Sequence, residues 1–306
     1  MACGSGSCFR RRRTFAAAAR GTRTPPYREP AVQRGRTLAL GVIALCLAAA
    51  AGGIRALSPG RSESDFRLDL ADSRIVGGGW FGPKPVMLTF DDGPANAAVD
   101  RSILATLSRH HARALWFVTC ARLDPALDPM AAENRATLRQ IVAEGHLLGN
   151  HGYSHVDLAA LGRAAPSRLA QEVGGCSAAI RAASGVVPAY FRPPWGRNSP
   201  GVRSAAAAAG MGVLLWSGNS FDSLLASFKR RPETFLSFVA RHPAFDIAAN
   251  ADAGEVLLMH DYPNTALALD DILTRLEKRG FRFVLPSKQS PPAPGDASPA
   301  PGSGRG

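Results

Sequence analysis

Cysteine is scarce in this chain of 306 residues, which contains five. Cys3, Cys8 and Cys46 lie ahead of the segment that we expect to fold, so only Cys120 and Cys176 remain inside it. Two cysteines cannot build the framework of a disulfide-rich secreted scaffold, and that class of protein is excluded. One bond between Cys120 and Cys176 stays open, but two separately buried thiols are the simpler expectation.

Acidic residues are also few, with 24 Asp and Glu against 36 Lys and Arg. Residues 1–36 contain nine arginines and a single acid, Glu29, so this segment supplies +8 of the formal net charge of +12. The rest of the chain carries only +4, which argues against a basic fold that binds nucleic acid. With 46% hydrophobic and 20% charged residues, the chain is not disordered as a whole and can bury a large core.

Long apolar runs are rare, and the most pronounced is Leu38–Ile54, which extends for 17 residues without a charge. This length is at the lower limit for a helix that crosses a bilayer. Arginines precede it and only Arg55 follows closely, which predicts a membrane anchor with a cytoplasmic amino terminus and an exported remainder. A cleaved signal peptide and a buried alanine-rich helix are the alternatives, and the long basic stretch favours the uncleaved anchor.

These segments predict the organisation of the chain. We expect a basic cytoplasmic tail over residues 1–36, a transmembrane or signal segment over 37–55, a polar linker over 56–74 and a folded domain over 75–286. Residues 287–306 are rich in Pro, Gly, Ser and Ala and predict a disordered tail. The folded domain has a normal size for one α/β unit.

Short apolar runs alternate with helical patterns inside the expected domain. The expected strands are Val86–Phe90, Ala114–Val118, Leu147–Asn150, Ala189–Arg192, Gly212–Trp216, Val256–Met259 and Phe281–Leu285. Helices are expected between them, for example at Asn134–Glu144, Ser167–Ser184 and Thr265–Arg279. This alternation predicts a mostly parallel sheet, open or closed into a barrel, with functional residues where the strands end.

Polar residues do fall at the ends of the expected strands. They are Asp91 and Asp92 after the first strand, His151 after the third, Arg192 after the fourth and His260 after the sixth. An Asp-Asp-Gly-Pro sequence alone is more typical of a turn than of a site. However, two adjacent carboxylates at a buried strand end repel each other and lose solvation, which a cation or a proton-transfer role would compensate.

A metal site is the second interpretation of these positions. His151 and His155 form an H-x-x-x-H pattern that can aim two imidazoles at one point. With Asp92 they would give two histidines and one carboxylate, which leaves a fourth position open for water, as in catalytic zinc sites. Four other histidines have no such candidate ligands near them in the sequence and are expected on the surface or in the core: His110, His111, His146 and His242.

Two further fragments carry side chains that could act in a site. Arg192 precedes a stiff aromatic turn that contains Trp195. Arg192 forms either a structural ion pair or a contact that orients Asp91, and Trp195 would then form a wall against a sugar ring. His260 ends an apolar strand where a general acid could lie, with Leu258 lining a small pocket.

Four motifs of this sequence, taken in order, resemble those of the metal-dependent polysaccharide deacetylases with a NodB-homology domain, a family of carbohydrate esterases. The motifs are Thr89–Pro94 (TFDDGP), His151–His155 (HGYSH), Arg192–Gly196 (RPPWG) and Leu258–His260 (LMH). The resemblance covers about residues 80–286 and implies an α/β fold, the distorted (β/α) barrel of that family. In this chain the barrel would follow one N-terminal transmembrane or signal helix.

The resemblance also implies a division of labour at the strand ends. Asp91 would be the general base, Arg192 would position it, and Asp92, His151 and His155 would hold a divalent metal. Zn²⁺ suits two imidazoles and one carboxylate, while Co²⁺, Ni²⁺ or Fe²⁺ can occupy the same geometry.

The remaining implied roles concern the leaving group and the acetyl group. His260 would be the general acid, and the backbone N–H of Trp195 would help to hold the oxyanion. Leu258 would line the pocket for the acetyl methyl group. A further family motif, usually Asp-x-x-Asp-Trp, reads Asn219-Ser220-Phe221-Asp222-Ser223 here. Asp222 would raise the pKa of His260, whereas Asn219 and Ser223 depart from the motif and leave the shape of the groove open.

The sequence therefore predicts a metal-dependent hydrolase that removes N-acetyl groups from amino sugars of a cell-envelope or extracellular polysaccharide. Peptidoglycan, chitin-like oligomers and poly-N-acetylglucosamine all present the same acetamide. The expected partners are this polysaccharide and a membrane, not nucleic acid. One alternative is hydrolysis of a non-sugar amide, against which Trp195 and an exported location count. The other is a catalytically silent glycan-binding module, which would most naturally have lost Asp91 or His260.

Overall fold

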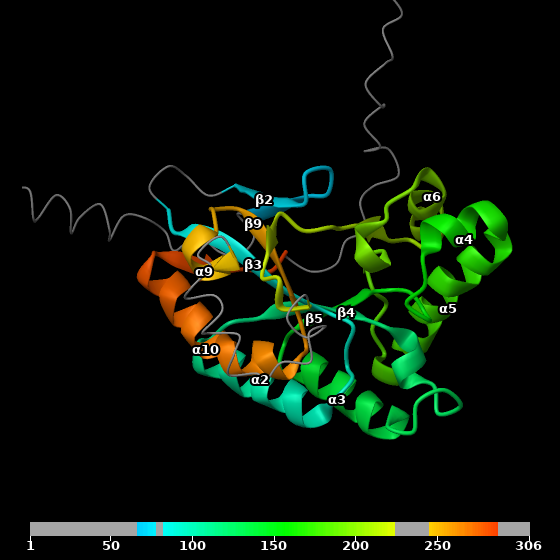
Figure 1. Cartoon of the computed structure of the whole chain (residues 1–306), viewed down its shortest axis with the longest axis horizontal. Coiled ribbons are helices and arrows are strands. Elements are labelled where there is room, and N and C mark those ends of the chain that lie inside the picture. The colour runs from blue at the N-terminus through cyan, green and yellow to red at the C-terminus, as the bar shows by residue number, and fades with distance from the viewer. Residues whose placement is uncertain (1–65, 78–81, 224–244, 287–306) are drawn as a thin grey trace, which may run out of the picture. The chain divides into compact units, whose positions relative to one another are not determined.

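Ten strands form one sheet in the computed structural model, which describes residues 66–77, 82–223 and 245–286 (Figure 1). The expected basic tail, the membrane or signal segment, the carboxyl-terminal tail and His242 lie outside these ranges. Within them, no helix combines the length and the apolar character that a bilayer crossing requires.

Seven strands of the sheet correspond to the seven that the sequence predicts. They are β3 (Lys84–Asp91), β4 (Ala114–Val118), β5 (Leu147–Asn150), β6 (Tyr190–Phe191), β7 (Gly212–Val213), β9 (Glu255–His260) and β10 (Phe281–Phe283). β6 ends earlier than expected because Pro193 and Pro194 follow Arg192 and have no N–H to donate to a neighbouring strand.

The central strands are parallel and run in the order β9-β3-β4-β5-β6-β7. β10 pairs with the amino-terminal half of β3. The two ends of the sheet, β1 and β7, do not pair with each other among the described strands. The expected distorted barrel is therefore a curled half-barrel, which leaves the carboxyl ends of the parallel strands along one open rim.

A hairpin extends the sheet beyond the strands that the sequence predicts. β1 (Phe66–Asp69) and β2 (Arg74–Gly77) are antiparallel, and Arg74 of β2 pairs with Glu255 of β9. β1 lies in the range expected as a linker, although the Phe66 side chain is buried. The short β8 (Gly218–Asn219) pairs with β9 on the same side of the sheet.

Helices connect the strands and cover the sheet. They are α2 (Ala97–Arg109), α3 (Ala131–Ala143), α4 (Leu158–Ala164), α5 (Pro166–Ser184), α6 (Pro200–Ala208), α9 (Ile247–Asn250) and α10 (Pro263–Lys278), with short 3₁₀ turns η2 (Cys120–Leu123) and η3 (Pro194–Gly196). α10, α2 and α3 lie in a row along one side of the sheet (Figure 1). Their inner faces bury apolar residues such as Leu104, Leu138 and Leu273 against Phe90 and Trp116.

The two cysteines of the folded domain are paired, contrary to the expectation of two separate thiols. A disulfide joins Cys120 of η2 to Cys176 of α5, and both side chains are fully buried. The expectation was wrong because 56 residues separate the two cysteines in sequence, and only the packing of α5 against η2 brings them together.

Candidate active site

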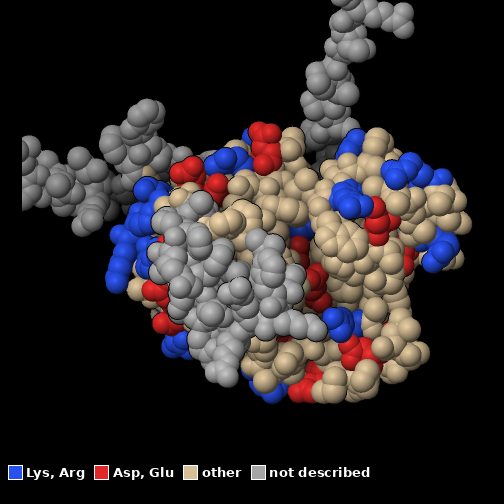
Figure 2. All heavy atoms as spheres, in the orientation of Figure 1, with Lys and Arg blue, Asp and Glu red and all other residues tan. Residues whose placement is uncertain are grey.

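The carboxyl ends of β3 and β9 lie side by side, and their register pairs Asp91 with His260. His151 follows β5 and Arg192 follows β6 in the same sheet. Contacts connect these residues with Asp92, His155, Trp195 and Asp222, as described below, so the structure brings the predicted site residues to one rim. Figure 2 shows acidic side chains set back in a hollow beside a surface that is largely uncharged.

Asp91 is held by Arg192 in a buried ion pair. The Nη1 atom of Arg192 donates to Asp91 Oδ1 at 2.8 Å and to Thr89 Oγ1 at 2.8 Å. Nε and Nη2 donate to the carbonyl oxygens of Leu214 and Leu215 at 3.1 and 2.6 Å. Arg192 has no exposed surface, so a single orientation of the guanidinium fixes the Asp91 carboxylate.

Asp92, His151 and His155 form the candidate metal centre. One ligand atom of each lies within 4.8 Å of the other two. The Oδ1 atom of Asp92 is 3.4 Å from Nε2 of His151 and 3.1 Å from Nε2 of His155. This Oδ1 atom is buried and accepts no hydrogen bond of good geometry. A divalent cation would satisfy this buried oxygen, so these three side chains fit a metal.

Neighbouring groups orient two of the three candidate ligands, His151 and Asp92. The Nδ1 atom of His151 lies 2.7 Å from the carbonyl oxygen of Arg192, so Nδ1 donates to that oxygen and Nε2 faces Asp92. The hydroxyl of Tyr262 donates to Asp92 Oδ2 at 2.7 Å. Burial would raise the pKa of Asp92, but the two imidazoles outweigh it and hold that pKa well below its ordinary value.

His260, the register partner of Asp91, is paired with Asp222. The Nδ1 atom of His260 lies 2.7 Å from Asp222 Oδ1, and the backbone N–H of His260 donates to Asp222 Oδ2 at 2.7 Å. Burial alone would lower the pKa of His260, whereas the negative charge of Asp222 raises it to about 9. His260 is therefore a cation at neutral pH with an Nε2–H that can donate a proton.

Asp222 is itself held in place by the start of α10. Thr265 Oγ1 donates to Asp222 Oδ2 at 2.6 Å, and Asn264 Nδ2 donates to the Asp222 carbonyl oxygen at 3.1 Å. Of the two residues that depart from the family motif, Asn219 closes a turn by accepting the backbone N–H of Phe221 at 2.7 Å. Phe221 packs edge-on against Phe245, with ring centroids 4.9 Å apart.

Trp195 and Leu258 are the two apolar residues that the sequence predicts in the site. Trp195 is 58% exposed, and its ring meets the ring of His155 edge-on, with centroids 4.7 Å apart. The backbone of Trp195 has a positive φ of 54°, which is uncommon for a bulky residue. Leu258 is 5% exposed and pairs with Thr89 across β9 and β3.

Comparison with known proteins identifies the family. A family model described as polysaccharide deacetylase matches residues 79–214. A chitooligosaccharide deacetylase of Sinorhizobium fredii is 32% identical over 212 residues, which cover 65% of this chain and 89% of that relative. The chain belongs to the polysaccharide deacetylase family.

Other members of the polysaccharide deacetylase family show the same likeness. The peptidoglycan-N-acetylglucosamine deacetylase PgdA of Listeria monocytogenes is 28% identical over 202 residues, which make up 66% of this chain but only 38% of that protein. A family 4 carbohydrate esterase from Streptomyces lividans superposes with a TM-score of 0.54 at 28% identity, over 68% of this chain and 95% of that one. The family also includes a pseudoenzyme, a mutant of which has restored activity.

Two features of this family member were missed by the sequence analysis. Tyr262 bridges the candidate metal centre and the candidate acid, because its ring stacks on His260 with centroids 5.0 Å apart while its hydroxyl binds Asp92. Its place two residues after His260 was the only available signal. Glu172 of α5 binds the backbone between His151 and His155 and has no sequence signal, because it lies 17 residues beyond His155 on a helix.

A buried pair of carboxyl groups also escaped the sequence analysis of this deacetylase-family chain. Asp100 and Asp261 are almost fully buried and hydrogen-bond to each other. Apart from this mutual contact, three of their four oxygens have no hydrogen-bond donor. Desolvation by burial raises the pKa of both groups, so the pair retains a proton beneath the loop that carries Asp92.

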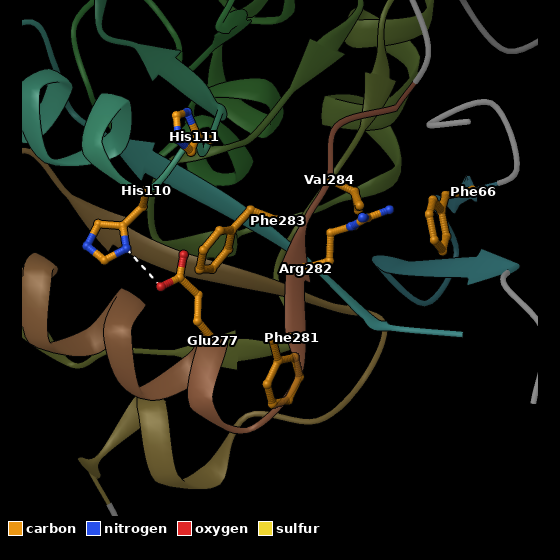
Figure 3. A pocket seen from close by; sticks show the side chains of 8 residues that line it. All are labelled: Phe66, His110, His111, Glu277, Phe281, Arg282, Phe283 and Val284. Atoms are coloured by element: carbon orange, nitrogen blue, oxygen red, sulfur yellow. Dashed lines mark hydrogen bonds and ion pairs between the residues drawn. The ribbon is translucent and has the colours of Figure 1, made fainter. Parts of the chain in front are cut away.

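The other described histidines lie away from the site, as the sequence predicts. His146 is a core residue that accepts the backbone N–H of Ala114 at 3.0 Å, and burial lowers its pKa to about 4. His110 and His111 line a cavity of about 320 Å³ with Glu277 and Phe283 (Figure 3). β10 lines the same cavity and pairs with the amino-terminal end of β3, so this cavity lies at the opposite end of the strand from Asp91.

Proposed function

We propose that the protein is a metal-dependent hydrolase that removes N-acetyl groups from N-acetylated amino sugars of a polysaccharide. The observation that carries this proposal is the arrangement around one point. Asp92, His151 and His155 converge there, and Asp91, fixed by Arg192, and protonated His260 lie at the adjoining ends of β3 and β9. Hydrolysis of an amide requires a base for water and an acid for the departing amine, and this rim provides both.

A divalent cation at the candidate centre would polarise the attacking water and the acetamide carbonyl. The residues of the chain supply the proton transfers. Asp91 accepts the proton of the attacking water, and Arg192 holds that carboxylate in one orientation. The backbone N–H of Trp195 donates to the developing oxyanion. His260 gives its Nε2 proton to the amine of the departing sugar, because Asp222 keeps the ring protonated.

The substrate follows from the surfaces around this rim. The exposed ring of Trp195 offers a platform for the apolar face of a sugar ring. Leu258 provides an apolar contact for a methyl group. The relatives named above act on peptidoglycan or chitooligosaccharides by their names, and both polymers present an N-acetylated glucosamine unit. We favour Zn²⁺ as the metal because two imidazoles and one carboxylate suit it, with Co²⁺, Ni²⁺ or Fe²⁺ as alternatives.

The protein is proposed to act outside the cytoplasm, anchored by residues 37–55. The apolar run and the arginines before it support this location, as does the disulfide in the folded domain. Protease treatment of intact cells tests it, since only an exported domain is degraded while the membrane remains sealed. Recovery of a shortened soluble protein from the medium would instead indicate a cleaved signal peptide.

Two alternatives remain distinguishable from this proposal. A hydrolase of a non-sugar amide would keep the metal and Asp91 but would not need the exposed Trp195. A silent glycan-binding module would keep Trp195 but would not need the Arg192–Asp91 and Asp222–His260 pairs, which are both formed.

Acetate release tests the three functions together. The full chain, loaded with metal, is incubated with N-acetylglucosamine oligomers and with peptidoglycan, beside the Asp91→Asn variant. Release by the wild type but not by the variant supports the deacetylase and begins to name its polymer. If metal is bound but no substrate releases acetate, the deacetylase proposal fails, and glycan binding then separates the two alternatives.

A further inference from the structure

The segment that joins the two candidate histidine ligands has an irregular backbone. Gly152 has a φ of 87° and His155 a φ of 54°. A positive φ is open to glycine but is unfavourable by about 1 kcal/mol or more for a residue such as histidine. Both imidazoles nevertheless aim Nε2 at Asp92 Oδ1. Contacts from outside the segment must therefore hold this conformation.

α5 holds one side of the segment through a single side chain, Glu172. Its Oε2 atom accepts the backbone N–H groups of Tyr153 and Ser154 at 3.0 and 2.9 Å. Its Oε1 atom accepts the hydroxyl of Ser154 at 2.5 Å. A charged acceptor strengthens each of these bonds relative to a neutral one. One carboxylate thus fixes two consecutive peptide groups between the two histidines.

η2 holds the other side of the segment through its backbone. The N–H of Cys120 donates to the carbonyl oxygen of Gly152 at 3.1 Å, and the N–H of Ala121 donates to that of Tyr153 at 2.7 Å. The side chain of Tyr153 adds a bond from its hydroxyl to Asp124 Oδ2 at 2.7 Å. The peptide groups of residues 152–154 are therefore bonded from both sides.

The disulfide connects the two sides. Cys120 begins η2, and Cys176 lies four residues after Glu172, one turn further along α5. The disulfide is covalent and buried, so it keeps η2 and α5 together. Both elements also form hydrogen bonds to the segment that carries the two histidines. The segment is enclosed by Glu172 on α5, the Cys120–Cys176 bond and the backbone of η2.

We propose that Glu172 and the Cys120–Cys176 disulfide act as a clamp that positions His151 and His155 and thereby sets the affinity of the centre for its metal. The inference rests on the metal site of the proposed function and not on the identity of the substrate. Neither Glu172 nor the disulfide touches the candidate ligand atoms. Both are positioning groups, and their effect should be seen in metal binding before it is seen in catalysis.

Metal affinity tests the clamp without any substrate. The full chain is freed of metal and titrated with Zn²⁺ in competition with a chromophoric chelator. The variants are Glu172→Ala, Glu172→Gln and the double variant Cys120→Ala/Cys176→Ala. Glu277→Gln is the matched control, because Glu277 also accepts a hydrogen bond from a partner side chain, His110, but lies at the distant cavity.

We expect the Kd for Zn²⁺ to rise by about 10–100-fold in Glu172→Ala and in the cysteine double variant, the range found for groups that orient metal ligands. Glu172→Gln should give a smaller rise, because its amide keeps one acceptor oxygen. Glu277→Gln should match the wild type. At saturating Zn²⁺ the variants should recover most of the wild-type kcat with an unchanged KM for substrate, which a general loss of structure would not allow.

A Kd within about twofold of the wild type in Glu172→Ala would overturn the clamp, and this variant decides the matter even if the cysteine variant does not fold. The clamp would also be overturned if the metal-free variants were less stable than the metal-free wild type but bound Zn²⁺ with the same Kd. If the wild type itself binds no Zn²⁺, Co²⁺, Ni²⁺ or Fe²⁺, the proposed function fails as well. If only the clamp is wrong, the wild type binds metal and the variants bind it with the same Kd.

Discussion

Two adjacent carboxylates at the end of β3 differ in their nearest partners, and the roles that we propose for them rest on this difference. Asp91 Oδ1 lies 2.8 Å from Arg192 Nη1, and Asp91 Oδ2 lies 3.8 Å from His151 Nε2, whereas Asp92 Oδ1 lies closer to the Nε2 atoms of His151 and His155, at 3.4 and 3.1 Å. The guanidinium occupies Asp91 Oδ1, which is why we assign the proton transfer, and not the main metal contact, to Asp91. Asp92 is positioned to bind the cation. The two residues are neighbours in sequence but should respond differently to substitution.

Asp91→Asn should retain the metal and lose turnover. The amide keeps the shape of the side chain but cannot accept the proton of water, and loss of a general base lowers kcat by about 10²–10⁴-fold. Metal content by elemental analysis, together with the rate of acetate release, checks this. Loss of metal along with activity would contradict the assignment of Asp91 as base.

His151→Ala and His155→Ala should each remove the metal at ordinary concentrations. Each substitution leaves only two of the three ligands, which is too few for a tight site. Elemental analysis after gel filtration measures the bound metal. A variant that still holds one equivalent tightly would show that the ligand set is different.

Asp222→Asn should move the alkaline limb of the pH profile to lower pH. In the wild type, Asp222 raises the pKa of His260 to about 9, so the acid stays protonated up to that pH. Without the carboxylate, burial lowers the pKa of the ring, and the alkaline limb of kcat/KM should fall by about one pH unit or more. An unchanged limb would mean that another group is the acid.

At the scale of elements, the strand pattern was predictable and the connections were not. The ends of β3, β5 and β9 carried their polar residues in the sequence, so the rim followed from the β/α alternation. β1 was too short to stand out from a linker, and the curl of the sheet depends on side-chain packing rather than on any local pattern. The disulfide could not be predicted because it depends on the packing of α5 against η2, which are far apart in sequence.

Gly149 of β5 leaves room for the ring of Phe117, on which the guanidinium of Arg192 stacks. A Cβ atom at this position would lie 2.5 Å from the ring of Phe117, and the guanidinium of Arg192 stacks on that ring at 4.0 Å from its centroid. Gly149→Ala should therefore destabilise the protein by about 1–3 kcal/mol and lower kcat by displacing Arg192. Thermal unfolding and acetate release measure the two effects.

Gly174→Ala on α5 is the matched control for this substitution. No atom lies within 4 Å of a Cβ at that position, and alanine favours a helix over glycine by about 0.5–1 kcal/mol. The variant should be as stable as the wild type or more stable, with unchanged activity. A stable and fully active Gly149→Ala protein would show that β5 does not support Arg192 in this way.

At the scale of the whole molecule, the buried Asp100–Asp261 pair links stability to pH. Burial raises the pKa of both carboxyl groups above the ordinary value of 3.8. The folded state then holds more protons than the unfolded state above about pH 4, so this pair makes the free energy of unfolding fall as pH rises. Below about pH 4 the pair no longer affects the free energy of unfolding, because the carboxyl groups are then protonated in both the folded and the unfolded state.

Asp100→Asn should reduce this pH dependence, because only one of the two buried carboxyl groups remains. We expect the free energy of unfolding of the variant, relative to the wild type, to be higher at pH 8 than at pH 5 by about 1–3 kcal/mol. Denaturant titrations at the two pH values measure the difference. Asp270→Asn is the control, because Asp270 is exposed and paired with Arg109; an equal rise in that variant would rule out the buried pair as the cause.

The central claim is that one centre of Asp92, His151 and His155 makes this chain a deacetylase. The most direct measurement is acetate release from N-acetylglucosamine oligomers while the metal-free full chain is titrated with Zn²⁺. The account predicts no release without metal, a rise that levels off at one equivalent, and no rise for Asp91→Asn at the same metal content. Acetate release that is independent of metal, or a fully loaded wild type that releases none, would contradict it.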